Sequence, residues 1–144
     1  MNFVIGVDPG LSKVGLALLE EGGRLVSRCI VPRSSAASEV ASLASGKSVE
    51  IALGDGTKTR EVEAEIISAM GERDSFRIVR VDERNSTVEG RRLFLLDNRK
   101  PWWVRLIPIG LRTPDRPWDD YVAEVIARRY LGITDNPTIK GNGR

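Results

Sequence analysis

The fold is indicated most clearly by the stretch Asn2-Phe3-Val4-Ile5-Gly6-Val7-Asp8-Pro9-Gly10. Four of the five residues from Phe3 to Val7 are apolar, which is typical of a central strand buried on both faces. Asp8 ends this strand, and Pro9-Gly10 predicts a turn after it. An unpaired carboxylate is costly to desolvate, so Asp8 needs a partner, and a hard divalent cation is the simplest candidate. The alternative is an Asx-type turn, in which the Asp8 side chain accepts hydrogen bonds from nearby backbone N–H groups.

Composition restricts the chemistry that the chain can perform. The 144 residues predict one domain, and the 41% hydrophobic and 29% charged residues are typical of a globular protein. The sequence contains no histidine, and Cys29 is its one cysteine. These counts exclude His-based acid–base catalysis, His-ligated zinc, an internal disulfide and a cysteine-rich metal site. The remaining chemistry must use carboxylates, hydroxyls, lysine and arginine.

The sequence also bears on location. No apolar run approaches the roughly 20 residues that a helix needs to cross a bilayer. The first residues enter a strand without a basic and apolar leader, so nothing indicates export. We therefore expect a cytoplasmic protein with no membrane partner.

Basic residues gather in the second half of the chain. The stretch from Arg84 to Arg116 contains eight basic and three acidic residues, with Trp102 and Trp103 among them. Such a stretch could face a polyanion, or it could be a solvated surface whose arginine stems cover apolar atoms. Four prolines between residues 98 and 118 exclude a long helix there and predict a lengthy loop, and such loops are often functional.

Apolar periodicity and turn residues predict the order strand, strand, strand, helix, strand, helix, strand, helix, helix. The predicted strands cover residues 3–7, 14–19, 24–31, 49–53 and 76–81. The predicted helices cover residues 36–44, a segment capped by Thr57 or Thr59 that ends at Gly71, residues 86–97, and a segment opened by Asp119 or Asp120. In the second of these helices we expect Val62, Ile66, Ile67 and Met70 to share one apolar face. Residues 32–35 are expected to form a loop.

This order predicts an α/β protein with a mixed five-stranded sheet, in which three antiparallel strands precede two parallel ones. Helices are expected on both faces of the sheet. The first strand should lie in the middle because it is the most uniformly apolar. The fourth strand is expected beside it and the fifth outside the fourth.

Acidic residues follow three of the apolar strands. Asp8, Asp55 and the pair Asp82-Glu83 stand at carboxyl ends of strands, where open α/β sheets place their sites. Asp119 and Asp120 open the last helix, where an acid can also serve as an N-cap. Carboxylates gathered within a few ångströms repel one another unless a cation is present. Two Mg²⁺ or Mn²⁺ ions about 4 Å apart would remove that conflict and support in-line attack of water on a phosphodiester.

Three motifs carry a resemblance to a known family. The first is Asp8-Pro9-Gly10 followed by Lys13, Val14, Gly15 and Ala17, and the second is Asp82-Glu83-Arg84-Asn85-Ser86-Thr87. The third is the segment from Asp119 to Leu131, an aspartate followed by small and apolar residues and ending in Tyr130-Leu131. In this order they resemble the D-x-G-x-x-x-x-G-x-A opening, the D-E-R-x-x-T signature and the closing helix of the YqgF/RuvX family. More distantly, they are similar to the RuvC resolvases.

The resemblance implies an RNase H-like fold over residues 1–132, followed by a tail over 133–144 whose composition predicts flexibility. It implies a metal-dependent endonuclease or exonuclease active on structured nucleic acid, in pre-16S rRNA processing during ribosome biogenesis or in Holliday junction resolution. Carried over residue by residue, Asp8, Glu83 and Asp119 would be catalytic and would bind Mg²⁺ or Mn²⁺. Asp120 would be an additional metal ligand, and Asp55 a possible one or an Asp-Gly turn.

The resemblance and the basic stretch together predict the nucleic-acid contacts. The residues expected to bind nucleic acid are Lys13, Arg84, Arg99, Lys100, Trp102, Trp103 and Arg105. Arg84 would clamp a phosphate through its planar fork, and the tryptophans would stack on unpaired bases or would pack the loop onto the sheet. Structured RNA and branched DNA both remain as substrates, and both a monomer and a homodimer remain open.

Two other functions fit parts of the sequence. The first is a nucleic-acid-binding module of the same fold that does not turn over, in which the acids serve only as caps and turns. The second is a nucleotide-binding fold of the actin and sugar-kinase kind, which also uses an Asp-x-Gly turn after its first strand. Those proteins need two such lobes, and this chain has residues for one.

Overall fold

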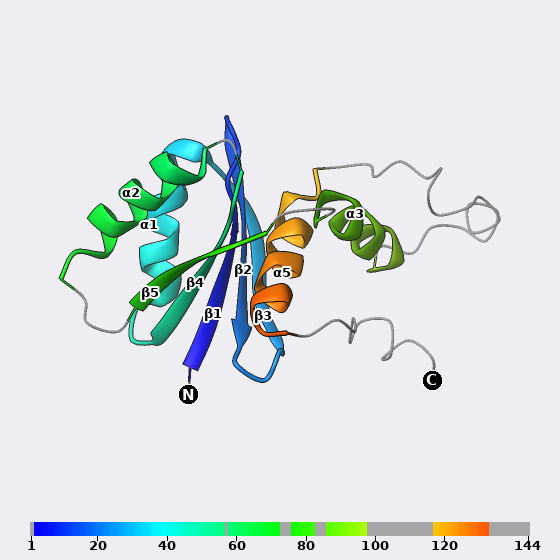
Figure 1. The fold of residues 1–144 in the computed structure, drawn as a ribbon, viewed down its shortest axis with the longest axis horizontal. Helices are drawn as coiled ribbons and strands as arrows, with labels where there is room; N and C mark the ends of the chain where they lie inside the picture. Colours follow the sequence, from blue (N-terminus) through cyan, green and yellow to red (C-terminus); the bar gives the residue numbers. More distant parts are fainter. Residues whose placement is uncertain (1, 57, 73–75, 83–85, 98–116, 133–144) are drawn as a thin grey trace.

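The computed structural model describes residues 2–56, 58–72, 76–82, 86–97 and 117–132. Its strands form one five-stranded sheet in the order β3-β2-β1-β4-β5 (Figure 1). The strands are β1 (Asn2–Asp8), β2 (Lys13–Glu20), β3 (Leu25–Pro32), β4 (Ser48–Gly54) and β5 (Phe76–Val81). The pairs β1–β2 and β2–β3 are antiparallel, whereas β1–β4 and β4–β5 are parallel. The predicted mixed sheet with a central first strand is therefore confirmed.

Helices cover both faces of this sheet, as predicted. Helices α1 (Arg33–Ala44) and α2 (Thr59–Met70) pack against each other on one face. Helix α5 (Asp119–Tyr130) lies on the other face, across β1 and β2. Helix α3 (Ser86–Asp97) packs on α5 and lies farther from the sheet (Figure 1). No helix within the described ranges has the length and apolarity that a bilayer crossing needs.

The alternation of side chains along β1 divides the core into two clusters. Ile5 and Val7 belong to the cluster beneath α1 and α2, whereas Val4 belongs to the cluster beneath α5. Successive strand residues point to opposite faces, so a strand covered on both sides must be apolar throughout. Gly6 lies directly under α5, because a Cβ at Gly6 would come within 2.0 Å of the Ala123 carbonyl oxygen. This close approach lets α5 sit deep on the central strand.

Helix α1 begins at Arg33, so the predicted loop over residues 32–35 is wrong. Pro32 occupies the N-cap position with a φ of −58°. A proline there costs no intrahelical hydrogen bond, because the first N–H groups of a helix have no partner within it. The buried residues Ala36, Val40 and Ala44 recur at every fourth position and direct this face of the helix toward the core.

The predicted side-chain caps are also wrong where the structure describes them. Lys58 occupies the N-cap position of α2, and Thr59 lies one residue inside the helix. Trp118 occupies the N-cap position of α5, which places Asp119 and Asp120 in the first turn, where the helix dipole favours an acid. Thr57 lies outside the described residues. Ile67 is 49% exposed, so it does not belong to the buried face of α2.

Candidate active site

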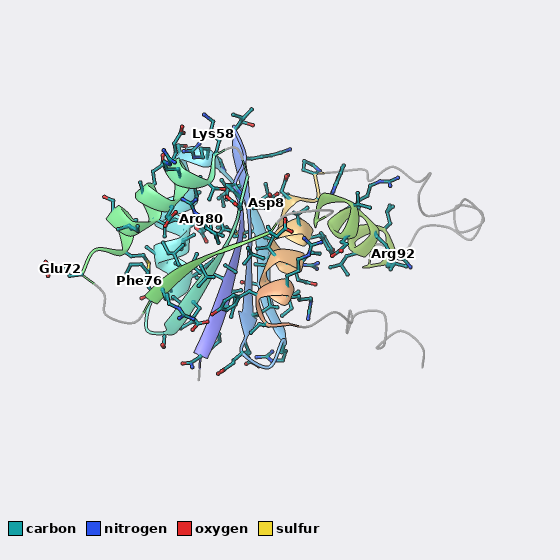
Figure 2. All side chains as sticks on the ribbon, in the orientation of Figure 1. Asp8, Lys58, Glu72, Phe76, Arg80 and Arg92 are labelled. Atoms are coloured by element: carbon teal, nitrogen blue, oxygen red, sulfur yellow. The ribbon has the colours of Figure 1, made fainter. Side chains whose placement is uncertain are left out.

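The site forms where β1 ends. Asp8 is the last residue of β1 and pairs in register with Gly15 of the antiparallel strand β2. Val4 packs beneath α5, and Asp8 lies four residues farther along the same strand, so its side chain is directed to the α5 face. Asp8 is half-buried, and its label in Figure 2 lies beside the end of α5 at which that helix begins.

Gly15 brings the first turn of α5 to this point. A Cβ at Gly15 would lie 1.9 Å from the Asp119 carbonyl oxygen and 2.8 Å from the Asp120 nitrogen. The backbone of Asp119 therefore rests directly on Gly15. Paired Cα atoms of antiparallel strands are about 4.5–5.5 Å apart. Asp8 is paired with Gly15, so it lies next to the residue on which the Asp119 backbone rests. The structure thus places the backbones of two predicted acids, far apart in sequence, on neighbouring positions.

Lys13 of β2 forms an ion pair with Asp119. Lys13 Nζ lies 3.6 Å from Asp119 Oδ2, and the two side chains are 46% and 31% exposed. Lys13 lies two residues before Gly15, so it stands on the same face of β2. The described part of the site therefore contains the carboxylates of Asp8 and Asp119 and the ammonium of Lys13.

Asp120 differs from its neighbour because it is buried, with an exposed fraction of 5%. Burial, followed by the negative charges of Glu39 and Asp120, raises the pKa of the Cys29 thiol above its ordinary value. Consecutive residues of an α-helix point about 100° apart, which explains why the two aspartates meet different surroundings. Asp119 is the aspartate of this turn whose carboxylate solvent can reach more easily.

A buried ionic network fixes the rest of α5. Glu124 is fully buried, and its Oε2 accepts a hydrogen bond of 3.2 Å from Arg128 Nε. Arg28 of β3 places Nη1 3.6 Å from Glu124 Oε1 and stacks its guanidinium 3.6 Å from the Tyr121 ring centre. Arg128 also donates to the Gly23 carbonyl oxygen at 3.1 Å. The network joins α5 to β3 and to the β2–β3 turn.

Sequence reasoning missed this network, because the burial that reveals it is visible only in the structure. Asp120, Glu124 and Arg128 recur at every fourth position of a helix whose residues 120–128 are all buried. Three charged residues in one buried row indicate ionic partners elsewhere in the fold. What the spacing does not reveal is that Arg28 is one of those partners.

Asp55 is placed differently from Asp8 and Asp119. It is exposed, and its backbone N–H donates to the Val81 carbonyl oxygen at 2.9 Å. The pKa of Arg80 is raised mainly by its hydrogen bond to Glu63 of α2 and to a smaller extent by the charge of Asp55. Leu53 packs beneath α1 and α2, and Asp55 lies two residues farther along the chain, so the exposed Asp55 is not part of the proposed site.

Thr59 shapes the turn that carries Asp55. Its buried hydroxyl donates to the Gly54 carbonyl oxygen and accepts from the Gly56 N–H, both at 2.6 Å. The hydroxyl thereby satisfies two backbone groups of the β4–α2 turn. This internal use explains why Thr59 is not available as a helix cap.

The other predicted site residues lie outside the described part of the chain. They are Glu83, Arg84, Arg99, Lys100, Trp102, Trp103 and Arg105. Within the described ranges, no group of three acidic or cysteine side chains could hold a metal ion. Asp8 and Asp119 provide two hard oxygen donors of the kind that Mg²⁺ and Mn²⁺ prefer, and the third predicted ligand is Glu83.

No protein-family model matches the sequence, and no curated protein is similar to it in sequence. Solved structures are similar in fold. One is the RuvC structure from Thermus thermophilus, with 17% identity and a TM-score of 0.50, over 90% of this chain and 94% of that chain. Another is T. thermophilus RuvC in complex with a Holliday junction substrate, with 16% identity and a TM-score of 0.49, over 92% of this chain and 95% of that one. The first similarity establishes the fold, which is RNase H-like α/β as predicted.

Proposed function

We propose that this protein is a divalent-metal-dependent nuclease that hydrolyses phosphodiester bonds in structured nucleic acid. The observation that carries the proposal is the packing of the Asp119 backbone on Gly15, the register partner of Asp8. This packing supports a site to which segments far apart in the chain each contribute one acid, at one edge of the sheet.

Each residue of the proposed site has a distinct role. Asp8, Asp119 and Glu83 would hold Mg²⁺ or Mn²⁺, and Asp120 would support them from the buried side of the same turn. When bound, two such ions supply an activated water and stabilise the leaving oxygen. Lys13, at the rim of the site, would contact a substrate phosphate with its partly exposed ammonium group.

The substrate class rests on the sequence motifs. Their resemblance to the YqgF/RuvX family supports precursor 16S rRNA, and their more distant similarity to the resolvases supports four-way DNA junctions. The basic and tryptophan-bearing stretch, through Arg84, Arg99, Lys100, Trp102, Trp103 and Arg105, would supply phosphate and base contacts for either substrate. We propose that both substrates be compared directly.

A cleavage assay tests the proposal. Purified protein with Mn²⁺ is incubated with a four-way DNA junction and with a structured RNA that carries a precursor end. We expect cleavage of at least one substrate by the wild type, and a loss of about a hundredfold or more in Asp8→Asn and Asp119→Asn, because each removes several kcal/mol of transition-state stabilisation. Asp55→Asn is the matched control, since it also replaces an edge aspartate, and we expect it to retain cleavage.

Substrate affinity separates this function from the alternative of a binding module. A nuclease should keep its affinity for nucleic acid in Asp8→Asn, or gain some, because a repelling charge is removed. Binding by the wild type without cleavage of either substrate, before or after mutation, would favour the binding module.

A further inference from the structure

The ion pair between Lys13 and Asp119 is long and partly exposed to solvent. Its 3.6 Å separation exceeds a normal hydrogen bond, and both side chains are partly exposed to water. Pairs exposed to this degree are weak, because water screens them and because a long lysine side chain loses freedom when it is held in place. The pair can therefore yield to a stronger ligand for either partner.

Other contacts than this pair hold α5 on the sheet. The helix rests on Gly6 and Gly15, and the buried Glu124 network ties it to β3. A lysine at the exposed rim adds little to such an attachment. The main effect of the Lys13 ammonium is therefore to partly neutralise the charge of Asp119, and not to hold the helix in place.

Each partner of the pair has a second ligand in the proposed function. Asp119 would bind a divalent cation, which carries twice the charge of an ammonium group. Lys13 would bind a phosphate of the nucleic acid. Either event removes one partner from the pair, so each ligand must overcome the same attraction before it binds.

We propose that the Lys13–Asp119 pair couples nucleic-acid binding to metal binding at this site. Whichever ligand binds first breaks the pair, and the second ligand then binds without that cost. Because such coupling is reciprocal, the metal tightens nucleic-acid binding by the same factor by which nucleic acid tightens metal binding. The inference rests on the proposed function, since it needs Asp119 to be a metal ligand.

Titration calorimetry with Mn²⁺ tests the first half of the inference. We expect Lys13→Gln to bind Mn²⁺ about two- to fivefold more tightly than the wild type, the factor that corresponds to an exposed ion pair. Lys13→Arg keeps the charge and should bind like the wild type. Lys47→Gln is the control, because it makes the same charge change away from the site. Lys47 lies over the ring of Phe3, and Phe3 is about 17 Å from Asp8 along β1 at the usual rise per strand residue. This variant should also bind like the wild type.

Fluorescence anisotropy tests the coupling itself. The affinity of a labelled four-way DNA junction is measured with and without Ca²⁺, an oxygen-liganded divalent ion, and the junction is checked on a gel afterwards for intact strands. We expect the divalent ion to tighten junction binding by a larger factor in the wild type than in Lys13→Gln. The ratio of the two factors should again be about two- to fivefold, because it reports the same ion pair.

The possible results separate the inference from the function on which it rests. Equal Mn²⁺ affinities in the wild type and Lys13→Gln would overturn the coupling and leave the nuclease proposal intact. Weaker Mn²⁺ binding by Lys13→Gln would also overturn the coupling, because it would make Lys13 a structural support of the site. Failure of the wild type to bind Mn²⁺ at all would overturn both proposals.

Discussion

The α-carbon of Gly15 lies so close to the carbonyl oxygen of Asp119 that a Cβ at residue 15 would stand 1.9 Å from that oxygen. Real Cβ atoms essentially never approach another heavy atom within 3.0 Å, so glycine is required here by space alone. The same residue pairs with Asp8 across the β1–β2 ladder. The lack of a side chain at Gly15 therefore lets the helix that carries Asp119 approach Asp8 closely.

Replacing Gly15 by alanine should therefore damage both stability and activity. The new methyl group must push the first turn of α5 away from β2, and overpacking of this kind costs about 1–3 kcal/mol of unfolding free energy. Urea denaturation measures this loss, and the cleavage assay measures the displacement of Asp119. Gly22→Ala is the control, since nothing lies within 4 Å of a Cβ there. A wild-type midpoint and activity in Gly15→Ala would contradict the packing that we describe.

Truncation of Glu124 should destabilise the fold more than truncation of an exposed acid. Glu124→Ala leaves the buried Arg128 and the half-buried Arg28 without their shared carboxylate, and breaking a buried ionic network costs about 3–5 kcal/mol. Glu89→Ala removes the exposed ion pair with Arg129 and should leave the urea midpoint nearly unchanged. Equal losses in the two variants would show that the Glu124 network does not anchor α5.

Substitution of Thr59 tests the turn after β4. Thr59→Val keeps the shape of the side chain but removes the hydroxyl that serves Gly54 and Gly56, and an unsatisfied buried polar group costs about 1–3 kcal/mol. Thr59→Ser keeps the hydroxyl and should retain most of the wild-type stability. The measurement is the free energy of unfolding from urea titration. A valine variant as stable as the serine variant would refute this role.

The reactivity of Cys29 gives a prediction that depends on pH. Burial and two nearby carboxylates raise the pKa of this thiol, so less of it is thiolate at a given pH than in an unstructured peptide. Alkylation by iodoacetamide should therefore be slower in the native protein, and its rate should rise at higher pH than for the urea-unfolded chain. The raised pKa also makes the free energy of unfolding depend on pH. The contribution of the Cys29 thiol to stability is fully present below its unfolded-state pKa, and it is lost as pH rises through its folded-state pKa. Identical pH–rate profiles for the native and unfolded chains would refute the shift.

The sheet could be predicted because its signals are local. The apolar run before Asp8, the short turns after β1 and β2, and the longer crossovers before β4 and β5 are all read within a few residues. The location of Asp8 at a carboxyl edge followed from the same signals. The first turn of α5 was also predicted, because its two aspartates precede a buried apolar row.

The contacts that complete the site could not be predicted, because they join segments far apart in the chain. Neither the contact of Lys13 with Asp119 nor that of Arg28 with Glu124 leaves a periodic pattern in the sequence. The start of α1 was misplaced because Pro32 resembles a loop residue until its N-cap position is known. Likewise, nothing local distinguishes Trp118 from the aspartates that follow it as the residue that precedes α5.

In the proposed nuclease, Asp8 and Asp119 share a divalent metal ion. The most direct measurement is an anomalous difference map from crystals grown with Mn²⁺, collected where manganese absorbs. We predict a peak within coordination distance of carboxylate oxygens of both residues, together with displacement of the Lys13 ammonium from Asp119. A map with no peak between the two carboxylates at saturating Mn²⁺, or with their side chains directed into separate regions of solvent, would show that Asp8 and Asp119 do not share a metal ion.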